Sequence, residues 1–111
     1  MIMKVSELIE NLSLTLVTES NYEDREIKGC YIGDLLSWVM GRAETDNVWI
    51  TIMNNINIVA VAALADVACI LLCEDVKVDQ SIIDKANSQN IIIVSSKLTA
   101  FELAEKLAGK V

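Results

Sequence analysis

Amide side chains gather in one short segment of this 111-residue chain, at Asn54, Asn55 and Asn57. Amides combine donors and acceptors in a small space, which suits a nucleobase, a ribose or the backbone of a partner protein. Turn and helix-cap formation is the competing interpretation, because asparagine is common in both places. Ser95 and Ser96 precede an expected helix, where hydroxyl groups either bind a phosphate or cap the helix. We expect these five side chains to form a ligand-binding site.

The usual catalytic motifs are absent from the sequence. It contains no histidine, which removes the most frequent general base and the most frequent metal ligand. It also contains no G-x-x-x-x-G-K phosphate loop, no G-x-G-x-x-G and no G-x-S-x-G. Glu74 and Asp75 are adjacent carboxylates, typical of a solvated loop, and with Asp79 they would hold a divalent cation only weakly. The sequence therefore predicts a protein without catalytic residues, metal or cofactor.

Three cysteines, Cys30, Cys69 and Cys73, do not suggest a disulfide framework, because their number is odd and the chain has ample apolar residues for a core. Cys69 and Cys73 lie in an apolar run, where a thiol behaves as a small hydrophobic group. A redox or metal module built from the three thiols is the alternative, although no C-x-x-C motif accompanies them. We interpret the thiols as structural.

The charge balance excludes several classes of partner. Sixteen acidic and nine basic residues give a net charge of −7, which repels the phosphates of nucleic acids and of anionic lipid. The N-terminus has no signal-peptide pattern, and the most apolar run, Ile56–Cys73, is too short and too often interrupted to span a membrane. We therefore expect one cytoplasmic domain over residues 1–111 that binds neither nucleic acid nor membrane.

Strand and helix patterns alternate in the last two-thirds of the chain. Each apolar run lacks a polar face and the connections are helix-sized, so the strands should be parallel. Ligands bind beyond the carboxyl ends of such strands, where the asparagines and serines lie. The expected strands are Val48–Ile52, Val67–Cys73 and Ile91–Val94, and the expected helices are Ile58–Leu64, Gln80–Ser88 and a last one behind a Thr99–Glu102 capping box.

The first third of the chain is less regular. Its expected elements are a helix at Val5–Asn11, strands at Leu14–Val17 and Lys28–Ile32, a loop at Thr18–Arg25, and a helix from an Asp34 cap to Met40 with Gly41 as its C-cap. This last helix is apolar nearly all round, which predicts burial on several sides. Core packing of Trp38 and a subunit interface are both consistent with that composition.

The order of elements resembles the DRTGG domain over nearly the whole chain. The resemblance rests on the run Val48–Asp75, on the Ser95–Ser96 pair and on the final helix. The segment Gly29–Ala43 resembles a narrower branch, the stand-alone DRTGG proteins of anaerobic bacteria. The family occurs in phosphotransacetylases and in pyrophosphatases with regulatory nucleotide-binding modules, and its fold is similar to the N-terminal domain of HPr kinase/phosphorylase. The resemblance implies an α/β fold, a parallel-sheet core of strand–helix repeats flanked by helices.

The sequence departs from the motif that names the family. An Asp-Arg pair is expected after the first core strand and a Thr-Gly-Gly after the second, where this chain has Asn54–Asn55 and Cys73–Asp75. An Asp-Arg pair does occur at Asp24–Arg25, but it lies upstream in a different context.

The resemblance implies nucleotide-linked regulation. We therefore expect a regulatory, ligand-sensing or adaptor domain that acts as a homodimer and binds a nucleotide, a small anion or a partner protein. Trp38, Met40 and the surrounding helix would contribute to the dimer surface. A phosphoryl-transfer enzyme related to HPr kinase is the alternative. The phosphate loop of that kinase lies in its other domain, which this sequence does not contain.

Overall fold

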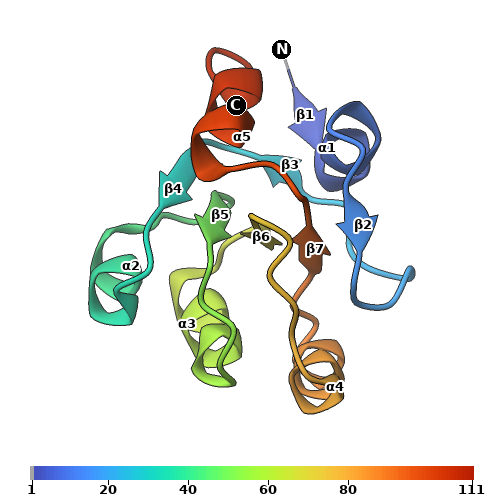
Figure 1. The fold of residues 1–111 in the computed structure, drawn as a ribbon, viewed down its shortest axis with the longest axis vertical. Helices are drawn as coiled ribbons and strands as arrows, with labels where there is room; N and C mark the ends of the chain where they lie inside the picture. Colours follow the sequence, from blue (N-terminus) through green and yellow to red (C-terminus); the bar gives the residue numbers. More distant parts are fainter. Residues whose placement is uncertain (1) are drawn as a thin grey trace.

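The computed structural model describes residues 2–111 and shows a central sheet with helices on both faces (Figure 1). The sheet has the strand order β2-β7-β6-β5-β4, in which β4 to β7 are parallel and β2 is antiparallel to β7. Its strands are β2 (Thr15–Leu16), β4 (Cys30–Ile32), β5 (Val48–Thr51), β6 (Cys69–Leu72) and β7 (Ile93–Ser95). A separate antiparallel pair joins β1 (Met3–Lys4) to β3 (Glu26–Ile27).

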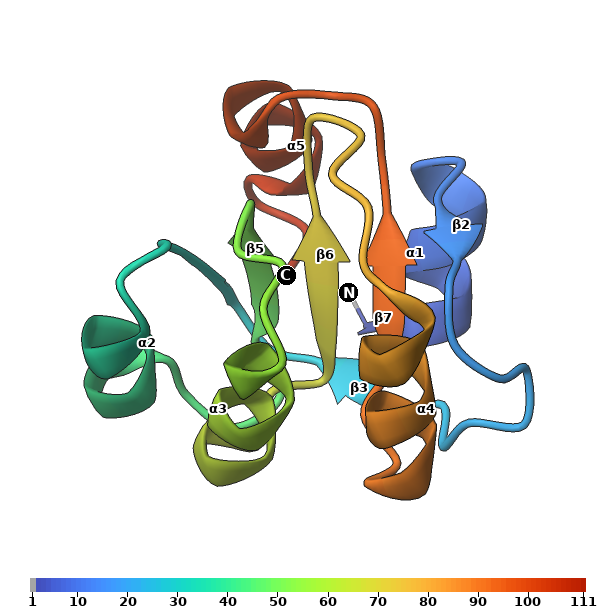
Figure 2. The same cartoon turned by 60° about the horizontal axis from the view of Figure 1, so that its bottom comes forward.

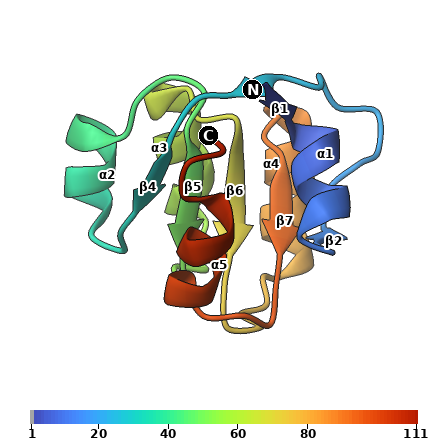
Figure 3. The same ribbon diagram turned by 90° about the horizontal axis from the view of Figure 1, so that it is seen from above.

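The helices divide between the two faces of the sheet. They are α1 (Val5–Asn11), α2 (Leu36–Arg42), α3 (Asn57–Ala65), α4 (Gln80–Ser88) and α5 (Ala100–Leu107). Seen from above, α1 and α5 cover one face, and α3 and α4 cover the other (Figure 3). Helix α2 lies at the edge of the molecule, beside the last strand β4 (Figures 1 and 3). None of the helices in residues 2–111 is long and apolar enough to cross a membrane.

The central strands are buried because their side chains are apolar on both faces. Val48 and Ile50 of β5 pack into the core beneath α1 and α5, whereas Trp49 packs into the core that includes α3 and α4. All four residues of β6 are buried in the same alternating way. The predicted parallel strands and the predicted α/β fold are therefore confirmed.

Helix boundaries follow the predicted caps in the second half of the chain. The α5 helix begins after Thr99, whose hydroxyl accepts a hydrogen bond from the Glu102 amide, as predicted for a capping box. The α4 helix begins after Asp79, although the Asp79 side chain makes no capping hydrogen bond. The α3 helix begins at Asn57, one residue before the predicted start, and α1 has the predicted bounds.

The strands of the first third were predicted less well. The strand predicted at Leu14–Val17 has only two paired residues, and the one predicted at Lys28–Ile32 begins at Cys30. Strands β1 and β3 were not predicted, because two residues are too few to show alternation.

The caps predicted for α2 are wrong. This helix begins after Leu35 rather than after Asp34, and it continues through Gly41, which is not a C-cap. The Asp34 carboxylate instead accepts hydrogen bonds from the Thr51 hydroxyl at 2.8 Å and from the Ile52 amide at 3.0 Å. Because its carboxylate bonds to the end of β5, Asp34 does not cap helix α2.

Within the single chain, α2 is not buried on several sides, contrary to the prediction from its composition. Val39 is fully buried, but Trp38 is 52% exposed, and Leu35 and Met40 are about half exposed. Helix α2 packs against α3 on one side only, because no element lies beyond it at this end of the sheet (Figure 1). Core packing of Trp38 is therefore excluded.

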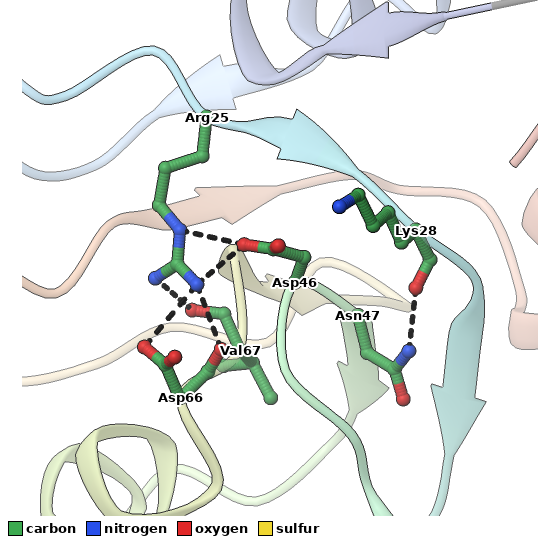
Figure 4. A network of polar contacts seen from close by, with 6 residues as sticks. All are labelled: Arg25, Lys28, Asp46, Asn47, Asp66 and Val67. Atoms are coloured by element: carbon green, nitrogen blue, oxygen red, sulfur yellow. Dashed lines mark hydrogen bonds and ion pairs between the residues drawn. The ribbon is translucent and has the colours of Figure 1, made fainter.

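Hydrogen bonds and ion pairs of Arg25 connect the segments that precede β5 and β6, at the amino ends of these strands (Figure 4). The Arg25 guanidinium forms an ion pair with Asp46 before β5, and it donates to the carbonyl oxygens of Asp66 and Val67 before β6 at 2.9 and 3.1 Å. Nearby, the Asn47 amide donates to the Lys28 carbonyl oxygen at 2.7 Å. Arg25 of the upstream Asp-Arg pair therefore has a structural role at the pole opposite the predicted ligand site.

Candidate functional site

The carboxyl ends of β5, β6 and β7 lie at one edge of the sheet because the three strands are parallel (Figure 2). A groove of about 510 Å³ opens at this edge, within the usual size range of small-molecule sites. Four segments that are distant in the sequence form it. Its lining residues are Asn11, Leu12, Ser13 and Thr15, then Asp75 and Lys77, then Ser95, Ser96, Lys97 and Leu98, and finally Lys106 of α5.

A tight turn after β6 contributes Asp75 to the groove. Glu74 and Asp75 both have positive φ, 55° and 59°, and the Val76 amide donates to the Cys73 carbonyl oxygen across them at 3.2 Å. Two consecutive residues with positive φ inside such a bond are characteristic of a type I′ turn, which favours glycine, asparagine and aspartate. Glu74 therefore occupies a backbone conformation that is unfavourable for its residue type.

This turn is held against the segment that follows β7. The Glu74 amide donates to the Leu98 carbonyl oxygen at 2.8 Å, and the Asp75 amide donates to the Ser96 carbonyl oxygen at 2.9 Å. The Ser96 amide in turn donates to Leu72 at the end of β6 at 2.9 Å. The groove wall is consequently a hydrogen-bonded extension of the sheet.

Ser95 and Ser96 line the groove. Both side chains are partly buried, and the Ser96 hydroxyl oxygen accepts a hydrogen bond from the Leu98 amide at 3.0 Å. This bond is ordinary loop chemistry, and it leaves the hydroxyl hydrogen free to donate to a bound anion.

The three asparagines lie at the same sheet edge but outside the groove. The Asn54 amide donates to the Lys77 carbonyl oxygen at 3.1 Å and so supports the segment that carries that lysine. The Asn55 side-chain oxygen accepts from the Asn57 amide at 2.9 Å, which is the turn-forming role that competes with ligand binding.

Three of the nine basic residues of the chain line the groove, namely Lys77, Lys97 and Lys106. With Asp75 they give the lining a formal charge of +2 on a chain of charge −7. The Lys77 ammonium lies 2.8 Å from the Asp75 carboxylate, and this hydrogen bond, with Lys97 nearby, holds the pKa of Asp75 below its usual value. Sequence reasoning missed Lys77 and Lys106 because no spacing pattern links them.

The arrangement is suited to anion binding. Ammonium and hydroxyl groups together are suited to phosphate or carboxylate oxygens. Within residues 2–111 no three histidine, cysteine, aspartate or glutamate side chains come close enough to hold a metal ion.

The cysteines do not form a site with one another. Cys30 on β4 and Cys69 on β6 flank Val48 of β5, so they lie two strand spacings apart, about 10 Å, which is beyond disulfide reach. Burial raises the pKa of Cys30 to about 11 and that of Cys69 to about 12, and it also raises the pKa of Cys73. Protonated thiols are poor nucleophiles, and together with the separation of Cys30 and Cys69 this disfavours the redox alternative.

Comparison with known proteins agrees with the fold. The sequence profile described as the DRTGG domain matches residues 7–109. A similar solved structure contains the CBS and DRTGG domains of the regulatory region of Clostridium perfringens pyrophosphatase, complexed with its activator diadenosine tetraphosphate. The TM-score is 0.71 at 11% sequence identity, covering 93% of this chain and 45% of the other, so this chain spans less than half of that region. No curated protein matches the chain.

Proposed function

This chain belongs to the DRTGG domain family, and on that basis we propose that it is a regulatory domain that binds a small anionic ligand at the carboxyl edge of its sheet. The proposal includes a homodimer, a cytoplasmic location and no catalytic activity. The observation that carries it is the cationic groove on an otherwise acidic chain. Free thiols in all three cysteines support a reducing compartment.

The ligand we propose carries phosphate groups. Phosphate oxygens would accept hydrogen bonds from Lys97, Lys106 and the Ser96 hydroxyl, all of which border the groove. The similar regulatory region is complexed with a nucleotide activator, which supports a nucleotide as the first ligand to test.

The asparagines belong to the same proposal as contacts for the rest of the ligand. Strands β5 and β7 flank β6, so their ends lie about 10 Å apart, which is comparable to the length of a nucleotide. A base or ribose extending from the groove towards β5 would meet Asn54, and beyond it Asn55 and Asn57. Ser95 would contact the ligand from the end of β7.

Binding would have a mechanical consequence that suits regulation. The groove joins the loop after β6, the loop after β7 and the end of α5, which are separate segments of the chain. An anion that bridges Lys77, Lys97 and Lys106 would restrain these segments relative to one another. The bound and free states would then present different surfaces to a partner protein.

A thermal-shift and calorimetric series tests the proposal. Diadenosine tetraphosphate, ATP, AMP and pyrophosphate are compared with uncharged adenosine. A ligand at one hundred times its Kd stabilises the folded state by about 2.7 kcal/mol, a rise in Tm of roughly 10 °C for a domain of this size. The double variant Lys97→Ala/Lys106→Ala should lose this rise, while Lys85→Ala, an exposed lysine on α4, should keep it.

Three outcomes would count against the proposal. If no anion raises the Tm, the domain does not bind such a ligand. If an anion raises the Tm of the double variant as much as that of the wild type, the ligand binds outside the groove. Release of phosphate from the nucleotides, lost in the double variant, would contradict a domain without catalytic activity.

A further inference from the structure

Helix α2 and its flanks expose large apolar side chains in one region. Ile32, Leu35, Trp38 and Met40 are each about half exposed, and they lie within twelve residues of the sequence from Tyr31 to Arg42. The hydrogen bonds from Thr51 and Ile52 to Asp34 bring the half-exposed Ile52 beside this segment. We call Ile32, Leu35, Ser37, Trp38, Met40, Gly41 and Ile52 the α2 face.

A glycine in the middle of this face is unexplained by the fold of a single chain. Gly41 is helical, and a Cβ atom at its position would meet nothing within 4 Å. Glycine is among the poorest helix formers, so alanine would suit the isolated helix better. The space at this position is open, and glycine permits the closest approach of another backbone.

Ser37 extends this surface of small residues by one turn. Ser37 and Gly41 lie two positions before and after the buried Val39, and therefore on the opposite, outward side of the helix. Trp38 and Met40 flank them on the two sides. The small residues form a shallow groove between the large apolar side chains. A second helix can pack into such a groove at a short interaxial distance.

We propose that the α2 face is the dimer interface, with the α2 helix of a second copy packed against it about a two-fold axis. The inference rests on the homodimer of the proposed function and names its surface. A two-fold axis places the same patch on both partners, so the patch must complement itself. Two helices that each present small residues between large apolar ones satisfy this condition.

The charge distribution favours a second copy as the occupant. Two chains of charge −7 repel one another wherever acidic surfaces meet. Between Gly29 and Ala43 the charged residues are Asp34 and Arg42, which are opposite in sign. Asp34 is bonded to Thr51, and the Arg42 guanidinium lies 3.7 Å from the centre of the Trp38 ring, so both charges already have partners in their own chain.

The available area approaches what a stable dimer needs. A half-exposed apolar side chain of this size presents roughly 100 Å², so the five large ones present on the order of 500 Å². A standard interface buries about 800 Å² on each partner. The α2 face continues along the uncovered edge of β4 into a shallow groove of about 250 Å³, lined by Cys30, Ile32 and the apolar end of α5. This region supplies the remaining area.

Sedimentation equilibrium with matched variants tests the surface. The wild-type chain should be a dimer, and Trp38→Glu and Gly41→Leu should each raise the dimer dissociation constant at least about 30-fold, as for hot-spot residues. Ser81→Glu is the control, because Ser81 is exposed on α4, which α3 separates from α2 (Figure 1). Gly41→Leu has room in the single chain and should fold even if Trp38→Glu does not.

Tryptophan fluorescence gives an independent measurement. Trp49 is fully buried, so a concentration-dependent blue shift should come from Trp38 and disappear in Trp38→Phe. A wild-type chain that stays monomeric would overturn both the homodimer and this interface, without affecting the ligand measurements on the groove. A dimer that survives both α2 variants would overturn the interface alone, and so would one that dissociates equally in Ser81→Glu.

Discussion

The replacement Glu74→Gly should stabilise the protein, although it removes a side chain and introduces the most flexible residue. Glu74 has a φ of 55° and occupies the first central position of the turn after β6. Its side chain is exposed and makes no hydrogen bond or ion pair with any residue in 2–111. The substitution therefore relieves backbone strain without removing a contact.

The expected gain follows from two opposing terms. A left-handed backbone costs an L-residue other than glycine about 1–2 kcal/mol. Glycine adds freedom to the unfolded chain and thereby costs about 0.5–1 kcal/mol. The free energy of unfolding should rise by about 0.5–1 kcal/mol, and Tm by roughly 2–5 °C.

Urea denaturation followed by circular dichroism measures this difference. Glu19→Gly is the matched control, because Glu19 is exposed and its φ is not positive, so glycine there should only destabilise. Asp75→Gly should change stability little, because aspartate tolerates positive φ and its carboxylate bonds to Lys77 at 2.8 Å. A loss of stability in Glu74→Gly equal to that in Glu19→Gly would refute the strain argument.

Two further predictions concern the other pole of the sheet. Arg25→Met should lower the free energy of unfolding by about 2–4 kcal/mol, because it leaves the partly buried Asp46 carboxylate and two carbonyl oxygens without their donor. Urea denaturation measures the loss, and a change below 1 kcal/mol would show that water replaces the guanidinium. The pKa of Asp24 is also informative: burial alone would raise it, but hydrogen bonds from the Ser6 hydroxyl and amide lower it overall. A lowered folded-state pKa stabilises the protein above the unfolded value of 3.8, and this contribution is lost as the pH falls through the folded-state pKa. The stability difference between wild type and Ser6→Ala should therefore be full at pH 6 and shrink below pH 4, whereas a difference independent of pH would contradict the assignment.

The parallel core could be predicted because it depends on patterns that are local in the chain. Val48–Thr51 and Cys69–Leu72 are apolar at every position but one, and burial on both faces is the only environment that suits such runs in a sheet. The Thr99–Glu102 capping box likewise needs only residues three apart. The positions of Ser95 and Ser96 at a strand end followed from the same reasoning.

The exposure of α2 could not be predicted, because it depends on which elements are left to cover it. The composition of α2 suits a buried helix, and only its position beyond β4 leaves Trp38 half exposed. Asp34 is a good helix cap by type, but its carboxylate bonds to Thr51, seventeen residues away.

The sequence thus determined the parallel strands, most of the helices and the edge of the sheet at which polar residues collect, since each depends on neighbouring residues. The tertiary structure alone brought Lys77, Lys97 and Lys106 to one groove and left Asn55 and Asn57 outside it. It also imposed positive φ on Glu74, where glycine would be easier. These features arise from contacts between segments distant in the chain, and no local pattern of residue types encodes such contacts.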